Sequence, residues 1–198
     1  TTLEHASIRS INNRIIIMAV RNTYDHKNGP HSVHGFRTGR FDFGINTTFI
    51  IYQLGETLID AGPTNQWPTI KRVLKPLAIK TLLITHHHED HSGNAGNILA
   101  EMQIPIYSNK LCQEKVQQVF NIPTIQKIIW GTAKAVNTQL LTDHFESELG
   151  VKMQILLTPG HTMDMSCFFD AENGFLFTGD LYIASKVKYF HKDEDLGQ

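Results

Sequence analysis

The residues whose types could do chemistry are concentrated in one short block, His86-His87-His88-Glu89-Asp90-His91. Histidine is the commonest metal ligand and the usual acid–base group near neutral pH, so histidines and acids this close together indicate a metal site. A zinc site on a helix needs the pattern His-Glu-x-x-His, and His91 comes one residue too early for it. In an extended segment alternate side chains point the same way, so His86 and His88 would face one side together. Asp90 and His91 would then turn towards a second position as the chain curls into a helix, which predicts two adjacent metal ions.

Two residues much further along the chain are candidates to complete this site, because a metal site needs three or more converging protein ligands. His161 follows the strand-like segment Val151–Leu157 and a Pro-Gly turn. Asp180 follows the strand-like segment Phe175–Thr178 and Gly179. Both stand where an apolar strand ends at a small residue, which lets a sheet present a ligand without crowding it.

The elements that must position these residues alternate between strands and helices, without repeats or low-complexity segments. The block follows a short apolar segment, Thr81–Thr85, that is typical of a strand covered on both faces, so we expect the chemistry at the carboxyl end of a strand. The other expected elements are a strand Ile15–Val20, a long loop Arg21–Gly44, a hairpin of Asn46–Gln53 with Thr57–Asp60, a helix Gln66–Leu77, a strand Pro105–Tyr107, a helix Lys110–Phe120 and a hairpin of Met165–Asp170 with Phe175–Thr178. Residues 121–150 are less regular and are expected to form an insertion or a lid.

The composition fits a single domain over residues 1–198. Of the 198 residues 41% are hydrophobic, which is enough for an apolar core without disulfide staples. Lys and Arg number 18 against 19 Asp and Glu, so the net charge of −1 supplies no basic field and disfavours nucleic acid as a partner. The longest early apolar run, Ile15–Val20, is far shorter than the ~20 residues of a membrane span. We therefore expect no membrane association and a cytoplasmic location.

Four segments, in order along the chain, resemble the motifs of the metallo-β-lactamase superfamily. The histidine block and its neighbours match the His-x-His-x-Asp-His signature of that family. The four segments are Leu58–Gly62, Thr85–Asn94, Thr158–Thr162 and Phe177–Asp180. The resemblance covers roughly residues 45–180 and implies an α+β fold, a four-layer αββα sandwich with a binuclear metal site at one edge of its two sheets.

Carried over residue by residue, the resemblance implies ligands for two divalent metal ions, with Zn²⁺ favoured and Fe or Mn as alternatives. One ion would be held by His86, His88 and His161, the second by Asp90 and His91, and Asp180 would bridge both. Asp60 would organise the ligand loop through hydrogen bonds, as metal sites require of the residues around their ligands. The family also uses a further histidine well beyond the bridging aspartate, and residues 181–198 are all that follow Asp180 here. We therefore expect that part of the C-terminal half of the fold is missing.

The resemblance implies metal-dependent hydrolysis of an ester-like bond in a small-molecule substrate, with a thioester or a lactone favoured. A metal-bound water can have its pKa lowered towards ~7 and attack as hydroxide. Asp90 would be the catalytic residue that orients this hydroxide or relays its proton, and Tyr182 is a candidate for substrate contact. Two other activities of the same fold stay open: a mono-iron oxidoreductase of the persulfide dioxygenase type, and a phosphodiesterase or RNA-processing nuclease. The sequence leaves the oligomeric state open.

Overall fold

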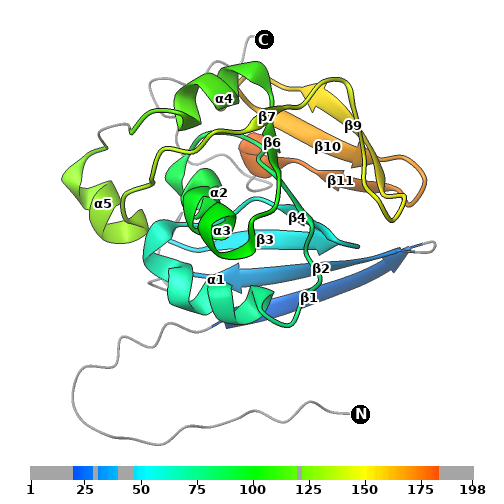
Figure 1. Cartoon of the computed structure of the whole chain (residues 1–198), viewed down its shortest axis with the longest axis horizontal. Coiled ribbons are helices and arrows are strands. Elements are labelled where there is room, and N and C mark those ends of the chain that lie inside the picture. Colours follow the sequence, from blue (N-terminus) through cyan, green and yellow to red (C-terminus); the bar gives the residue numbers. More distant parts are fainter. Residues whose placement is uncertain (1–19, 29–30, 40–46, 120–121, 183–198) are drawn as a thin grey trace, which may run out of the picture.

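The computed structural model describes residues 20–28, 31–39, 47–119 and 122–182 of the chain. These residues form two sheets that share a core, with helices packed against the larger sheet (Figure 1). In the described residues the larger sheet has the strand order β1-β2-β3-β4-β5-β6-β7, and the smaller sheet has the order β11-β10-β9-β8. The pairings from β1 to β4 and all those of the smaller sheet are antiparallel, whereas β4 to β7 pair in parallel.

The strands of the larger sheet are β1 (Val20–Asn28), β2 (His31–Thr38), β3 (Phe49–Leu54), β4 (Thr57–Ile59), β5 (Thr81–Leu83), β6 (Ile106–Ser108) and β7 (Gln139–Leu140). The strands of the smaller sheet are β8 (His144–Glu146), β9 (Lys152–Leu157), β10 (Ser166–Asp170) and β11 (Phe175–Phe177). The helices are α1 (Trp67–Leu74), α2 (Glu89–Ser92), α3 (Ala95–Met102), α4 (Lys110–Val116) and α5 (Thr124–Trp130), with short 3-10 turns η1 (Thr64–Gln66) and η2 (Gly179–Leu181).

The strand that leads to the histidine block, β5, is buried on both faces. Leu82 packs into a core shared with α1 and α3, whereas the next residue, Leu83, packs into a second core shared with the smaller sheet. Successive side chains of a strand point to opposite faces, so one short apolar run serves both cores. Each such side chain contributes about 1.5–3 kcal/mol when it is fully buried. These two cores hold the end of β5, and with it the start of the histidine block, in a fixed place.

The two sheets and the helices packed against the larger one form the α+β arrangement that the sequence predicts. The described residues supply three of the four expected layers: helices, the larger sheet and the smaller sheet. The outward-facing Leu156 and Leu176 of the smaller sheet are exposed in this part of the chain. The hairpin β3–β4, the strand β5, the helix α1 and the hairpin β10–β11 closely match the expected ranges, so those predictions are confirmed.

One expectation is wrong: the long loop over Arg21–Gly44 is instead a β-hairpin as far as residue 38. The first strand of that hairpin lies at the edge of the sheet, where polar side chains face solvent and guard against further pairing. Gly35, in the second strand, lies against Tyr52 of β3, and a Cβ there would come within 3.2 Å of the ring carbon Cε1. The glycine therefore marks a close contact between strands and not a turn. The strand expected over Ile15–Val20 lies outside the described residues except for Val20, which begins β1.

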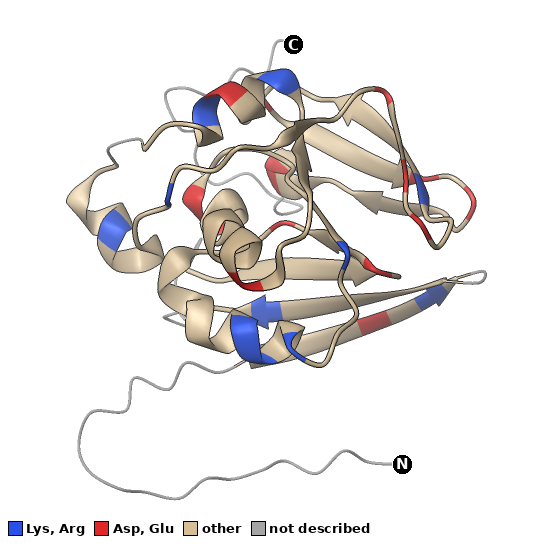
Figure 2. Cartoon of the chain, in the orientation of Figure 1, with Lys and Arg blue, Asp and Glu red and all other residues tan. Residues whose placement is uncertain are grey.

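Residues 121–150, expected as an insertion or a lid, contribute strands to both sheets. β7 pairs with β6 and β8 pairs with β9. Whether this region also acts as a lid stays a prediction. Within the described residues, no helix combines the length and the apolar character that crossing a membrane requires. In the described residues, Lys and Arg are scattered over several elements, as Figure 2 shows.

Candidate metal centre

The site is built just beyond the carboxyl end of β5, next to the smaller sheet. Ile84 and Thr85 follow β5, are fully buried and lead directly into His86. The main-chain carbonyl of Thr85 accepts a hydrogen bond from the N–H of Ser166, the first residue of β10, over 2.9 Å. The larger and the smaller sheet are thus joined directly at the base of the histidine block.

The block changes conformation in the way that the sequence predicts. His88 has an extended backbone, with φ −57 and ψ 151, and α2 begins at the next residue. The rings of His86 and His88 lie with their centroids 4.7 Å apart. The ring of His91, on α2, lies 4.2 Å from that of His86. The turn into the helix therefore brings His91 back beside the extended segment.

Three histidines from two distant segments form the first group of potential ligands, here called the three-histidine group: His86, His88 and His161. A nitrogen of each lies within 4.8 Å of the others. Nε2 of His161 is 3.1 Å from Nδ1 of His88. Nε2 of His86 is buried and has no hydrogen-bond partner among the described residues. An unsatisfied buried nitrogen costs about 1–3 kcal/mol, so a metal ion bound there would satisfy a group that the protein leaves open.

His86, His91 and Asp180 form a second group, again with ligand atoms within 4.8 Å of one another. Nε2 of His91 is 3.1 Å from Oδ1 of Asp180, and the other oxygen, Oδ2, is 3.5 Å from Nε2 of His161. Asp180 therefore reaches both groups, at the place where a bridging ligand is expected. Oδ2 of Asp90 lies 3.8 Å from Nε2 of His91, beside the second group. The metal-binding role of each of these residues stays a prediction.

Asp60 holds the loop that carries the block. It follows β4 with a left-handed backbone, φ 60, and its side chain is buried. Oδ1 accepts the main-chain N–H of Thr85 at 2.8 Å, and the hydroxyl of Thr85 lies 2.9 Å from Oδ2. Nδ1 of His91 is 2.7 Å from Oδ2. Asp60 thus has the contacts expected of a residue that orients the ligand loop.

The surroundings of the site shift the pKa values of its histidines in opposite directions. Burial lowers the pKa of His86 well below its usual value, and burial together with neighbouring histidines lowers the pKa of His88 to about 3. Burial also disfavours the charged form of His91, but the carboxylates of Asp180 and Asp60 prevail and raise its pKa well above the usual value. Burial opposes ionisation of Asp180, yet His91 lowers its pKa to about 2. His86 and His88 are therefore neutral, which is the form that binds metal.

Asp90 and Tyr182 were the remaining sequence candidates. Burial raises the pKa of Asp90, His91 opposes this shift and Asp180 adds to it. Tyr182 directly follows η2 and is 66% exposed, so its proposed substrate contact stays a prediction. His87, the spacer between two candidate ligands, is outside both groups in the described part of the chain and faces Asp164 instead. Sequence reasoning missed Asp164, which lies three residues beyond His161 and carries no motif signal of its own.

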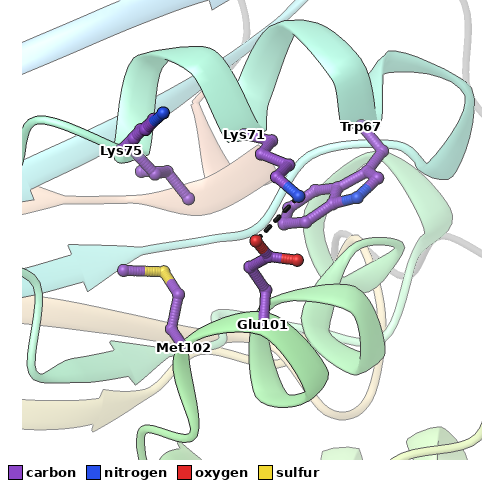
Figure 3. A pocket seen from close by; sticks show the side chains of 6 residues that line it. Trp67, Lys71, Lys75, Glu101 and Met102 are labelled. Carbon is purple, nitrogen blue, oxygen red and sulfur yellow. Dashed lines mark ion pairs between the residues drawn. The ribbon is translucent and has the colours of Figure 1, made fainter.

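One cavity among the described residues lies away from the candidate ligands. It has a volume of about 320 Å³ and lies between α1 and α3, lined by Trp67, Lys71, Leu74, Lys75, Glu101 and Met102 (Figure 3). Nζ of Lys71 and Oε1 of Glu101 form an ion pair of 2.7 Å across it. This cavity shares no residue with the two ligand groups. This cavity is therefore separate from the predicted metal site.

Residues 40–192 match the family model of the metallo-beta-lactamase superfamily, and the chain belongs to that superfamily. A hydroxyacylglutathione hydrolase of Idiomarina loihiensis is 30% identical over 122 residues, covering 61% of this chain and 38% of that protein. A thioesterase of Emericella nidulans, pkgB, is 30% identical over 152 residues, covering 74% of this chain and 38% of that protein. A beta-lactamase-like protein 2 homolog of Caenorhabditis elegans is 27% identical over 188 residues, covering 90% of this chain and 54% of that protein.

The solved structures agree on the fold. The metallo-beta-lactamase IND-7 superposes with a TM-score of 0.60 at 17% identity, covering 89% of this chain and 80% of that one. A metallo-beta-lactamase from Pontibacter korlensis gives a TM-score of 0.56 at 16% identity, covering 88% and 80%. At such low identity the likeness shows the fold alone. The chain spans from 38% to 54% of the length of the three curated relatives above.

Proposed function

We propose that this chain carries the metal centre of a zinc-dependent hydrolase that cleaves an ester-like bond in a small molecule, with a thioester favoured over a lactone. One observation carries the proposal: ligand atoms from three separate segments converge into two groups that share His86 and are spanned by Asp180. In a purely structural cluster of ion pairs the buried polar atoms have hydrogen-bond partners, whereas here the buried Nε2 of His86 has none among the described residues. This is the donor set that zinc and other borderline metals prefer.

The residues present fit two divalent ions. His86, His88 and His161 would hold one ion, and His91, Asp90 and Asp180 would complete the second. Bound metal supplies a Lewis acid for the carbonyl group of the substrate and a water of lowered pKa.

The chain's own residues prepare this chemistry before any substrate binds. Burial keeps His86 and His88 neutral and ready to bind, because it makes their charged forms costly. Asp60 fixes the ring of His91 by accepting its Nδ1 hydrogen, so Nε2 points at Asp180. Asp90 lies beside His91, with Oδ2 3.8 Å from Nε2, where its carboxylate would accept a proton from the attacking water and pass it to the leaving group.

Two relatives support the choice of a thioester. Their names describe a hydroxyacylglutathione hydrolase and a thioesterase, each 30% identical to this chain. In Figure 2 the Lys and Arg residues of the described part of the chain are spread over several elements, and the net charge is −1, which favours a small molecule over nucleic acid.

The test is a substrate panel on the zinc-loaded chain: a simple alkyl thioester, a γ-lactone and a phosphodiester, with the metal content measured by elemental analysis. We expect thioester hydrolysis to exceed the other two. The Asp180→Ala variant should lose bound metal and at least 100-fold in kcat/KM, whereas a variant of an exposed carboxylate of the smaller sheet region, Asp143→Ala, should keep both.

Full metal content and full activity in Asp180→Ala would refute the assignment of this site. Preferred cleavage of the phosphodiester would favour a nuclease, and activity that depends on iron and consumes oxygen would favour the oxidoreductase.

A further inference from the structure

A buried carboxylate outside both ligand groups ties the two loops of the three-histidine group together. The side chain of Asp164 has no exposed area. Its Oδ2 accepts the main-chain N–H of His87 at 2.9 Å, and its Oδ1 lies 2.9 Å from Nδ1 of the same histidine. His87 stands between the candidate ligands His86 and His88, and Asp164 stands three residues after the candidate ligand His161. Asp164, in the loop that carries His161, is therefore hydrogen-bonded to the loop that carries His86 and His88.

Helix α4 supports Asp164 from a third direction. Nζ of Lys115 donates to Oδ1 of Asp164 at 2.6 Å. Asn109, the N-cap of α4, donates from Nδ2 to the main-chain carbonyl of Asp164 at 2.7 Å and to the hydroxyl of Ser166 at 2.8 Å. A buried charge of this kind is costly unless it is paired and hydrogen-bonded, and here both conditions are met. The side chain and the main chain of Asp164 are thus both fixed.

We propose that Asp164 is a positioning residue of the three-histidine group: through His87 it fixes the spacing between His161 and the pair His86 and His88. The inference rests on the metal centre of the proposed function and adds a residue that sets the affinity of one of its two sites. The bond to the N–H of His87 restrains the peptide between the two ligand histidines, and the short turn from Thr162 to Met165 transmits the same restraint to His161.

His91 and Asp180, which would hold the second ion together with Asp90, are held by other contacts, so the two sites should respond differently. His91 is fixed by Asp60, and Asp180 follows Gly179 at the end of β11. Loss of Asp164 should therefore weaken metal binding at the three-histidine group and spare the ion that His91, Asp90 and Asp180 would hold.

The experiment is a titration of the metal-free full chain with zinc in competition with a chromophoric chelator, which resolves two dissociation constants without any substrate. Removing a residue that orients metal ligands typically weakens affinity by about 10–100-fold. We expect that loss at one site in Asp164→Ala, with less than about threefold change at the other. Cobalt in place of zinc should show an altered visible spectrum for one ion.

Asp170→Ala is the matched control, because Asp170 is an equally buried carboxylate at the opposite end of β10 that holds Asn173 through two hydrogen bonds. It should lower stability and leave both zinc affinities unchanged. If Asp164→Ala fails to fold, the near-isosteric Asp164→Asn decides by the same titration, because both oxygens of Asp164 face donors and an amide must turn its NH2 group towards one of them.

Three outcomes overturn the inference, and they are distinguishable. If the wild type binds no zinc, the proposed metal centre itself fails. If the wild type binds two ions and the Asp164 variants keep both affinities, the centre stands and the positioning role fails. If the Asp164 variants weaken both sites equally, or Asp170→Ala weakens them as well, the effect is one of general stability.

Discussion

At the level of single residues, the site holds histidines in opposite protonation states within a few ångströms. His86 and His88 are kept neutral by burial, whereas His91 is kept protonated in the metal-free chain by the carboxylates of Asp60 and Asp180. In the metal-free chain, protonated His91 therefore pairs with the carboxylate of Asp180, and a metal ion would take the place of the His91 proton. Proton release from His91 should accompany metal binding, because a ligand must be deprotonated to bind.

These shifts predict how the stability of the metal-free chain depends on pH. The folded pKa of His88 is about 3, below the ordinary value of 6.5, so the unfolded chain takes up a proton that the folded chain rejects. Stability should therefore fall as pH drops below about 6.5, with a slope of ~1.4 kcal/mol per pH unit for each such histidine. His91 acts in the opposite direction: its folded pKa is raised, so its contribution is complete below 6.5 and is lost as pH rises through the folded pKa.

Urea unfolding of the metal-free protein between pH 6 and 4.5 measures this slope. His88→Gln should make it shallower by about 1.4 kcal/mol per pH unit. His144→Gln, at an exposed histidine of β8, should leave it as it is. An unchanged slope in His88→Gln would show that His88 takes up its proton normally in the folded state.

The candidate ligands and Asp60 could be found from the sequence, but Asp164 could not. His86, His88 and His91 share one short block, and spacing alone indicates their common role. Asp164 is 77 positions from His87, and nothing local to either residue signals their hydrogen bond. Such contacts arise only when the sheets pack, so they need the fold to be known.

At the level of elements, the turn after β4 controls where the ligand loop begins. Gly62 has a positive φ of 69, and a Cβ there would lie 2.2 Å from Cε2 of Phe49 and 2.7 Å from Cδ1 of Ile70. The main-chain carbonyl of Gly62 also accepts the N–H of Asn94, just after α2. The carbonyl of Gly62 therefore holds the end of α2 close to β4. A side chain at this position would clash with Phe49 and Ile70.

Gly62→Ala should lower the free energy of unfolding by about 2–5 kcal/mol, since overpacking typically costs about 1–3 kcal/mol and a left-handed backbone costs about 1–2 kcal/mol more. Gly150→Ala is the matched control, because Gly150 has a φ of 85 and a Cβ there would meet nothing within 4 Å. Gly150→Ala should lower the free energy of unfolding only by the cost of the left-handed backbone, about 1–2 kcal/mol. Equal losses in the two variants, measured by denaturant unfolding, would show that the crowding at Gly62 relaxes without cost.

Sequence patterns predicted the strands with apolar or alternating side chains, such as β5 and β9, and missed the polar edge strand β1. β5 contains most of the short apolar run Leu82–Ile84, which Thr81 and Thr85 bound, so its composition and length identify it. β1 is polar along its length because it lies at the sheet edge, and its side chains from Asn22 onwards are exposed. Composition there indicates a loop, and only pairing with β2 makes it a strand.

At the level of the whole molecule, the proposed metal centre joins two layers that come from different parts of the chain. His86, His88 and His91 follow β5 of the larger sheet, whereas His161 follows β9 and Asp180 follows β11 of the smaller sheet. The order of motifs along the sequence predicted that these segments meet. It did not predict how the sheets are held together without metal, which depends on the shared core and on hydrogen bonds such as that from Ser166 to Thr85.

Metal binding should therefore stabilise the whole molecule and not only its loops. A ligand that binds the folded state alone stabilises it by ~2.7 kcal/mol at a free concentration 100 times its Kd. For a chain of this size that amounts to a rise in Tm of roughly 5–10 °C. His161→Ala removes the ligand contributed by the smaller sheet and should reduce the rise by at least half, whereas His144→Ala, at an exposed histidine of the same sheet, should preserve it. Thermal unfolding with zinc and with chelator measures both, and an equal rise in the two variants would mean that zinc does not bridge the sheets through His161.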